Sequence, residues 1–204
     1  GSILPKKESN LMSSVAGRIN KVLIEEGDEV KKNQILAYID IKNYEWLYEI
    51  SLSNLEKAEL VYETTKIETL INDLDYKRMQ SLKNSSAFNV SKFDKLKNIK
   101  SILESKEKIA LSELNIERNK NKIANLNYQK SIVRAPFSGV IEKKMVDIGE
   151  VVSIGTPMFN LVNKEQLEVF AEIPSFRTYG LNKGDIIKVI SSDKITLDAT
   201  IRAI

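Results

Sequence analysis

Residues 15–39, VAGRINKVLIEEGDEVKKNQILAYI, and residues 137–161, FSGVIEKKMVDIGEVVSIGTPMFNL, follow one pattern in one register. In each stretch, short runs of alternating apolar and polar residues flank a glycine that lies beside an acidic residue, which is typical of β-strands joined by tight turns. A shift of 122 positions superposes the glycines without a gap: Gly17 on Gly139 and Gly27 on Gly149. The two stretches therefore predict the halves of one small β-domain with a long insertion between them.

The four glycines of this repeat are expected to serve structural turns, because glycine adopts positive φ at little steric cost. Asn33 stands where the second half has Gly155, and asparagine is the residue that next best tolerates left-handed geometry. Packed together, the halves would make a flattened β-sandwich of about 60 residues, near the lower limit for independent stability. The alternative is a pair of unrelated β-hairpins that happen to share glycines.

The insertion lacks glycine and proline over residues 41–82 and again over residues 89–128, so each stretch is predicted to be a long helix. The eight residues 83–90 contain the turn between them, which makes the helices antiparallel. Apolar residues recur every seven positions, and we expect them to form the seam of a left-handed coiled coil, with Ser105 and Ser112 allowing close approach. These heptad residues are Leu60, Ile67 and Leu74 in the first helix and Ile102, Ile109, Ile116 and Ile123 in the second. A coiled-coil arm for dimerisation is the alternative interpretation.

The composition excludes several classes of function. The chain of 204 residues has no cysteine and no histidine, which rules out disulfides, Cys/His zinc sites, thiol nucleophiles and Ser-His triads. The formal net charge of +3 does not indicate a nucleic-acid partner. No run of about 18 apolar residues that could span a membrane occurs in the sequence. We therefore expect no catalytic residue, no cofactor and no metal site.

Charge is sorted along the predicted hairpin, with the basic end at the turn. Seven Lys or Arg residues and a single acid lie between Tyr76 and Lys100, whereas residues 42–75 carry eight acids and three lysines. Lys92, Lys95 and Lys97 follow a helix N-terminus, where the helix dipole disfavours cations. An acidic partner that binds the tip is the natural hypothesis, and a solvated basic face is the alternative.

Four segments resemble the periplasmic adaptors, or membrane fusion proteins, of tripartite efflux pumps, and most closely those of RND-type transporters. Residues 13–40 resemble the first lipoyl half of that family, and residues 131–152 resemble the second half through Ala135-Pro136-Phe137 and Gly139. Residues 167–190 resemble the start of the family's β-barrel domain, and the fourth segment is the hairpin tip.

The resemblance implies an α+β fold: a split lipoyl-like β-sandwich with an inserted antiparallel α-helical hairpin, followed by a partial β-barrel domain. The implied boundaries are 13–40 and 131–162 for the lipoyl-like domain, 41–130 for the hairpin, and 3–12 with 163–204 for the barrel part.

At the tip, the resemblance implies a contact with an outer-membrane exit duct. The family has an arginine, a leucine four residues later and a serine seven beyond, and Arg78, Leu82 and Asn89 fall at those spacings. Asparagine replaces the serine, a mild change because both residues are strong N-caps. Lys83, Phe88 and Lys92 are neighbouring candidates for the same contact. Local roles compete at the three motif positions: a solvated cation, a packing leucine and a helix cap.

As a function, the resemblance implies a non-enzymatic periplasmic adaptor that bridges an inner-membrane transporter, expected to be of RND type, to an outer-membrane channel for export of drugs or other small molecules. It also implies self-association into a ring, expected to be a hexamer, and an inner-membrane anchor through a segment that this sequence does not contain. Two alternatives remain: a type I secretion adaptor that works with an ABC transporter, and a biotin or lipoate carrier. The carrier lacks its reactive lysine, because no lysine lies at a tight turn between adjacent strands.

Overall fold

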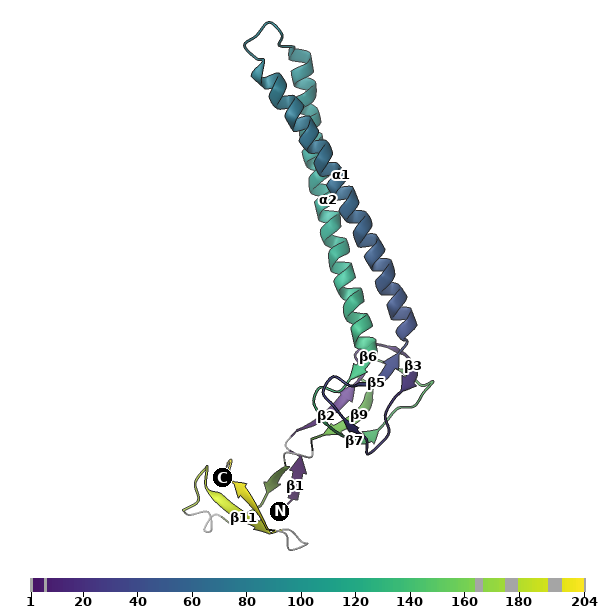
Figure 1. Cartoon of the computed structure of the whole chain (residues 1–204), viewed down its shortest axis with the longest axis vertical. Coiled ribbons are helices and arrows are strands. Elements are labelled where there is room, and N and C mark those ends of the chain that lie inside the picture. Colours follow the sequence, from purple (N-terminus) through teal and green to yellow (C-terminus); the bar gives the residue numbers. More distant parts are fainter. Residues whose placement is uncertain (1, 6, 164–166, 175–179, 191–195, 204) are drawn as a thin grey trace. The chain divides into compact units, whose positions relative to one another are not determined.

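The computed structural model describes residues 2–5, 7–163, 167–174, 180–190 and 196–203. The chain divides into two compact units, one formed by residues 8–162 and the other by residues 1–7 with 163–204. The first unit contains a β-sandwich and a long helical hairpin (Figure 1).

The β-sandwich consists of two four-stranded sheets, and each sheet takes strands from both halves of the sequence repeat. One sheet has the order β2-β9-β7-β4, with β2 at Glu8–Met12, β9 at Pro157–Val162, β7 at Gly139–Lys144 and β4 at Glu29–Val30. The other has the order β6-β5-β3-β8, with β6 at Ile132–Arg134, β5 at Ile35–Ile39, β3 at Gly17–Val22 and β8 at Val151–Val152.

The two halves exchange equivalent hydrogen bonds. The amide of Gly27 donates to the carbonyl of Ile141 at 2.8 Å, and the amide of Gly149 donates to the carbonyl of Ile19 at 2.9 Å. The short strands make the same exchange, since β4 pairs with β7 and β8 pairs with β3. Each turn glycine thus bonds to the other half, and the strands of the two halves pair with each other, so the halves fold as one module and the alternative of two unrelated hairpins is wrong.

Between the sheets lies a core of aliphatic residues around one phenylalanine, Phe159. Its most deeply buried members come from both halves and have no exposed surface: Ile19, Leu36, Ile39, Ile141, Met158, Phe159 and Leu161. Removing this apolar area from water is the main stabilising contribution to the sandwich.

The four repeat glycines fall into two structural classes. Gly27 and Gly149 lie in turns with φ of 91° and 90°, and Asn33 matches Gly155 with φ of 68° against 88°. Gly17 and Gly139 begin strands β3 and β7, so their expected role as turn residues is wrong. They permit close approach instead: a Cβ at Gly17 would lie 2.8 Å from Cβ of Asp40, and one at Gly139 would lie 2.3 Å from the carbonyl oxygen of Val162.

The hairpin consists of α1, Ile41–Ser81, and α2, Val90–Ser131, which run back along each other from the sandwich (Figure 1). Side chains of the sandwich region hold the start of α1. The amide of Ile41 donates to Oδ1 of Asn20 at 2.9 Å, and the Tyr44 hydroxyl donates to the carbonyl of Ala16 at 2.7 Å. The base of the rod is thereby tied to β3 and to the segment just before it.

The seam between the helices is not the one that the apolar heptads predict. Leu60 is 60% exposed and Ile109 is 69% exposed, so both face outward. Each helix has a run of buried or half-buried residues at alternating spacings of three and four, as in a coiled coil, but these residues include many polar, small and aromatic side chains. On α1 they are Tyr48, Ser51, Leu55, Ala58, Tyr62, Thr65, Thr69, Asn72, Tyr76 and Met79. On α2 they are Phe93, Leu96, Lys100, Leu103, Glu107, Ala110, Leu114, Glu117, Asn121, Ala124, Tyr128 and Ser131.

In the second unit, the described residues form two antiparallel ladders. Strand β1, Ser2–Pro5, pairs with β10, Leu167–Phe170, and β11, Ile186–Ile190, pairs with β12, Thr196–Thr200. Strand β2 pairs with β9 of the sandwich, although the sequence pattern grouped residues 8–12 with the barrel segment. That boundary is corrected to residue 7, because β2 completes the outer edge of a sandwich sheet.

Candidate functional site

The hairpin tip is a compact turn with its own hydrogen bonds. Helix α1 ends at Ser81, and the amide of its C-cap, Leu82, donates to the carbonyl of Met79 at 3.2 Å. The amide of Ser85 donates to the carbonyl of Leu82 at 2.8 Å, and that of Phe88 to the carbonyl of Ser85 at 3.1 Å. The turn therefore presents its side chains on an ordered backbone.

Arg78 lies in the last turn of α1, where the helix dipole favours a cation. Its Nη1 pairs with Oδ1 of Asp75 at 3.1 Å, yet 78% of the Arg78 side chain remains exposed. A guanidinium has five N–H donors, so this single contact leaves most of them available. Arg78 can bind carbonyl or carboxylate oxygens of a partner without losing its own support.

Asn89 caps the second helix, as its N-cap chemistry predicts. Its backbone is extended, and its Oδ1 accepts a hydrogen bond from the amide of Lys92 at 2.9 Å. This engagement takes one lone pair of the amide oxygen and leaves the Nδ2 group outward on an exposed residue. Lys92 contributes its amide to the cap while its side chain is exposed.

Leu82 and Lys83 are both exposed on the turn, and Leu82 retains 39% of its surface. Phe88 differs, because it packs on the chain itself. Its ring lies 5.5 Å from that of Phe93, which stacks on Tyr76 at 5.1 Å. This aromatic cluster joins the turn to both helices, a role that the sequence pattern did not predict. Its only signal in the sequence was three aromatic residues close to the turn.

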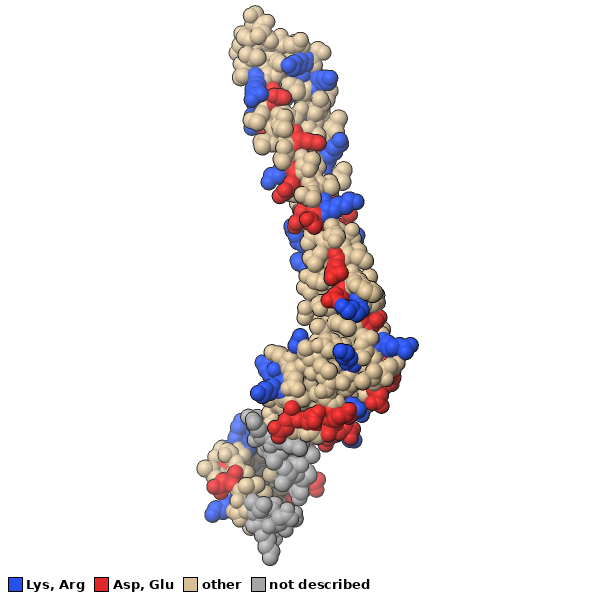
Figure 2. All heavy atoms as spheres, turned by 45° about the vertical axis from the view of Figure 1, so that its right-hand side comes forward, with Lys and Arg blue, Asp and Glu red and all other residues tan. Residues whose placement is uncertain are grey.

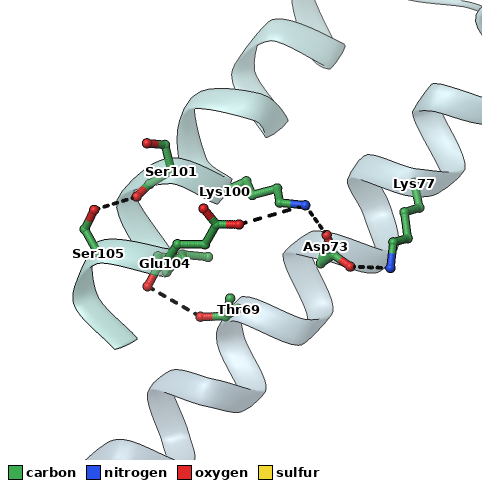
Figure 3. A network of polar contacts seen from close by, with 8 residues as sticks. Thr69, Asp73, Lys77, Lys100, Ser101, Glu104 and Ser105 are labelled. Carbon is green, nitrogen blue, oxygen red and sulfur yellow. Dashed lines mark hydrogen bonds and ion pairs between the residues drawn. The ribbon is translucent and has the colours of Figure 1, made fainter. Parts of the chain in front are cut away.

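Below the aromatic cluster, a polar network crosses the seam (Figure 3). Asp73 pairs with Lys77 on its own helix at 2.7 Å and with Lys100 on α2, and Lys100 also lies 3.9 Å from Glu104. The hydrogen bond from Lys100, followed by that from Lys77, lowers the pKa of Asp73 below its ordinary value. The same bond to Asp73 raises the pKa of Lys100. Both shifts favour the charged forms, so the pair of Asp73 and Lys100 stays ionised across the neutral range.

The charges of the first unit are unevenly distributed on the face shown in Figure 2. Basic side chains lie close to the far end of the hairpin, and acidic side chains gather on the sandwich. Lys144 lies among the sandwich carboxylates, 2.7 Å from Glu25 and 3.2 Å from Asp147. The described residues contain no cluster of three or more acidic side chains arranged to hold a metal ion.

No helix within the described ranges combines the length and the apolarity needed to cross a membrane.

Comparisons with known proteins agree with this architecture. Residues 7–164 match the family described as RND MFP, barrel-sandwich hybrid domain. The multidrug export protein EmrA of Haemophilus influenzae is 21% identical over 87% of this chain and 54% of its own length. The multidrug resistance protein MdtA of Xenorhabdus bovienii is 24% identical over 100% of this chain and 44% of its own length. The chain thus spans about half the length of these curated relatives.

Two solved structures share the fold. The crystal structure of MacA from Actinobacillus actinomycetemcomitans superposes with a TM-score of 0.81 and 17% identity, covering 100% of this chain and 64% of that one. A MacA-MexA chimera that carries the Pseudomonas aeruginosa MexA α-hairpin gives a TM-score of 0.69 and 19% identity, over 99% of this chain and 64% of that one. Because the family match covers the sandwich and the hairpin together, the chain belongs to the RND membrane fusion proteins.

Proposed function

We propose that this chain acts as a periplasmic adaptor in a tripartite efflux pump. It bridges an inner-membrane transporter to an outer-membrane channel and takes no part in covalent chemistry. The observation that carries this proposal is a rod of two helices, 41 and 42 residues long, held at its base by a compact sandwich. At 1.5 Å per residue such a rod reaches about 60 Å, so it carries the tip far from the sandwich.

The tip supplies the channel-binding surface in this proposal. Arg78 donates to carbonyl or carboxylate oxygens of the channel, and the exposed Leu82 fills an apolar groove beside it. The exposed side chains of Lys83 and Lys92 accelerate association with an acidic channel end. Asn89 contributes its free Nδ2 group, and Phe88 supports the turn from inside the aromatic cluster.

The inner-membrane partner is proposed to be an RND-type transporter, and the adaptor is proposed to act in the periplasm as a ring of copies, expected to be a hexamer. The exported compounds are drugs or other small molecules. The family match supports the RND-type partner, and the names of the relatives, a multidrug export protein and a multidrug resistance protein, support the export of drugs.

Site-specific photocrosslinking in cells tests the tip assignment. A photoreactive residue at position 78 or 82 of the full-length adaptor is expected to capture an outer-membrane channel. Position 115, where the exposed Asn115 lies on the middle of α2, serves as the matched control and is expected to capture no channel. Capture of only the adaptor itself from positions 78 and 82 would overturn the tip assignment.

A further inference from the structure

The outward apolar residues of the hairpin form two stripes, one along each helix. The α1 stripe is Leu60, Ile67 and Leu74, and the α2 stripe is Ile102, Ile109, Ile116 and Ile123. All of these side chains are between 45% and 69% exposed. Apolar surface that continues along a whole rod marks a contact with another protein.

Contacts within the seam fix which positions of the two helices lie at the same height. The Nδ2 of Asn121 donates to Oγ of Ser51 at 3.0 Å. Nine residues after Ser51 comes Leu60, and nine residues before Asn121 comes Ser112. Leu60 and Ser112 therefore lie level with each other on the outer surfaces of α1 and α2.

The same register relates a second pair. Thr69 Oγ1 faces the carbonyl oxygen of Leu103 at 3.5 Å, so Ile67, two residues before Thr69, is level with Ser105, two residues after Leu103. At both heights a large apolar residue on α1 corresponds to a small residue on α2.

Each small residue of α2 lies between two isoleucines of the α2 stripe. Ser112 lies between Ile109 and Ile116, at the spacings of three and four residues that are neighbours on a helix surface. The hydroxyl of Ser105 donates to the carbonyl of Ser101 at 2.9 Å (Figure 3), so covering it would leave no unpaired donor. In helix packing, a small residue between larger neighbours is a position that accepts a leucine or isoleucine knob from a facing helix.

The flanking charges match in the same register. Glu63 on α1 is level with Ile109 on α2, so its height differs from that of Lys108 by one residue. In the same way, Glu49 is level with Ile123 and one residue from the height of Lys122. None of these four residues forms an ion pair with another described residue. Over their full lengths, α1 carries eight acidic and five basic residues, whereas α2 carries five acidic and ten basic residues.

We propose that the α1 stripe of one copy packs against the α2 stripe of a second copy, with Leu60 seated at Ser112 and Glu63 beside Lys108. This inference rests on the proposed self-association and names the surfaces that meet. The contact is head-to-tail, because each copy uses a different helix. Such contacts close into a ring when the rotation between copies allows it. A two-fold pair would instead place the acidic α1 surface against its own copy.

Cysteine crosslinking of the full-length adaptor tests the packing, since residues 1–204 include no cysteine that would compete. The double variant Leu60→Cys with Ser112→Cys is expected to form a ladder of disulfide-linked dimers and larger species under mild oxidation. Each single variant is expected to stay at the background of the unsubstituted protein. A bridge within one chain is excluded, because a disulfide needs Cα atoms about 4.4–6.8 Å apart and these positions lie on opposite outer surfaces.

Each other outcome overturns one defined part of the proposals: the packing, the self-association or the tip docking. Dimers of the single Leu60→Cys variant would show that like stripes meet and would overturn the head-to-tail packing. An adaptor that sediments as a multimer while the double variant gives no ladder would also overturn the packing, but would leave self-association standing. If the adaptor stays monomeric under conditions where positions 78 and 82 capture the channel, both the packing and the proposed self-association are wrong. A ladder without channel capture would remove only the tip docking.

A charge swap provides an independent measurement. Glu63→Lys or Lys108→Glu alone places like charges together and is expected to weaken self-association about fivefold. The double swap in one chain restores the pair at every head-to-tail contact and is expected to recover the original association constant. If the double swap is weaker than both single variants, the assigned register is wrong.

Discussion

The sandwich and the hairpin of this membrane fusion protein distribute their apolar residues in opposite ways. In the sandwich, Phe159, Leu36 and Ile141 are fully buried. In the hairpin, the seam contains Ser51, Asn72 and Lys100, while isoleucines such as Ile109 lie on the surface. The sandwich therefore contains its own stabilising core, and the hairpin keeps much of its apolar area available to other proteins.

The polar seam has a consequence for specificity. A coiled coil with an all-apolar seam is stable in several registers, whereas polar residues at seam positions select one register at some cost in stability. Asn72 is buried, and its Oδ1 has no hydrogen-bond partner within the described structure, a cost that an apolar residue would avoid. The seam thus fixes the register of α1 against α2. The proposed packing needs this fixed register, because it pairs residues of the two outer stripes that lie at the same height along the rod.

The largest expected effect compares one buried and one exposed apolar side chain. Phe159→Ala removes a fully buried ring and is expected to lower the free energy of unfolding of the sandwich by about 3–5 kcal/mol. Ile109→Ala removes a side chain that is 69% exposed and is expected to change the stability of the monomer by about 0.5 kcal/mol or less. Urea unfolding of both variants at low protein concentration measures the difference. Equal losses would contradict the division between a closed core and an open rod.

The next effect lies within the sandwich and separates its two classes of glycine. Gly139→Ala places a Cβ 2.3 Å from a backbone carbonyl oxygen that cannot move freely, and is expected to cost about 2–3 kcal/mol. Gly149→Ala meets no atom within 4 Å, so its cost is the strain of φ at 90°, about 1 kcal/mol. Thermal unfolding of the two variants ranks them. A larger loss for Gly149→Ala would show that turn strain outweighs close approach.

The sequence predicted the sandwich well because its evidence was a repeat. The gapless match of two 25-residue stretches requires equivalent backbones, and the reciprocal hydrogen bonds of Gly27 and Gly149 follow from it. The sequence predicted correctly that glycine is structurally required at positions 17 and 139. The prediction that these two glycines lie in turns was wrong. Steric contact with Asp40 and Val162 depends on where the last strand of each half passes, which a one-dimensional pattern does not contain.

The hairpin shows a different limit of sequence reasoning. Its helices and turn followed from the absence of glycine and proline, but its seam did not follow from its apolar heptads. A seven-residue repeat of Leu60 and Ile67 predicts a packed stripe without saying whether the partner is the same chain or another. The assigned tip residues lie on the turn or in the adjoining ends of α1 and α2, while the roles of Phe93 and Asp73 were visible only from the contacts between the helices.

A smaller effect is expected at the tip end of the rod, where the start of α2 is stabilised by an N-cap hydrogen bond and not by a buried core. Asn89→Ala removes the acceptor for the amide of Lys92 and is expected to destabilise the first turn of α2 by about 1 kcal/mol. Amide hydrogen exchange in that turn is expected to become about fivefold faster. The control is Asn98→Ala, at an exposed position inside α2, where alanine has the better helix propensity. Faster exchange in the control as well would show that the turn responds to any loss of a polar side chain.

The smallest effect is the pH dependence of the polar network that joins the two helices below the tip. The lowered pKa of Asp73 means that its contribution to stability is present above its ordinary value of 3.8 and is lost as the pH falls through the lower value of the folded state. The raised pKa of Lys100 means that its contribution is complete below 10.5 and is lost only as the pH rises beyond it.

Asp73→Asn is therefore expected to increase hydrogen exchange near the tip at pH 7, and to match the unsubstituted protein once the pH lies below the folded-state pKa of Asp73. Asp75→Asn is the control, because its ion pair with Arg78 is more exposed and joins residues of one helix only. A difference between Asp73→Asn and the unsubstituted protein that persists unchanged at such a pH would show that shape, and not charge, links the helices here. The network would then stabilise the helix pair by packing, as the aromatic cluster does. The charges of Asp73 and Lys100 at neutral pH would have no part in fixing the register of the two helices.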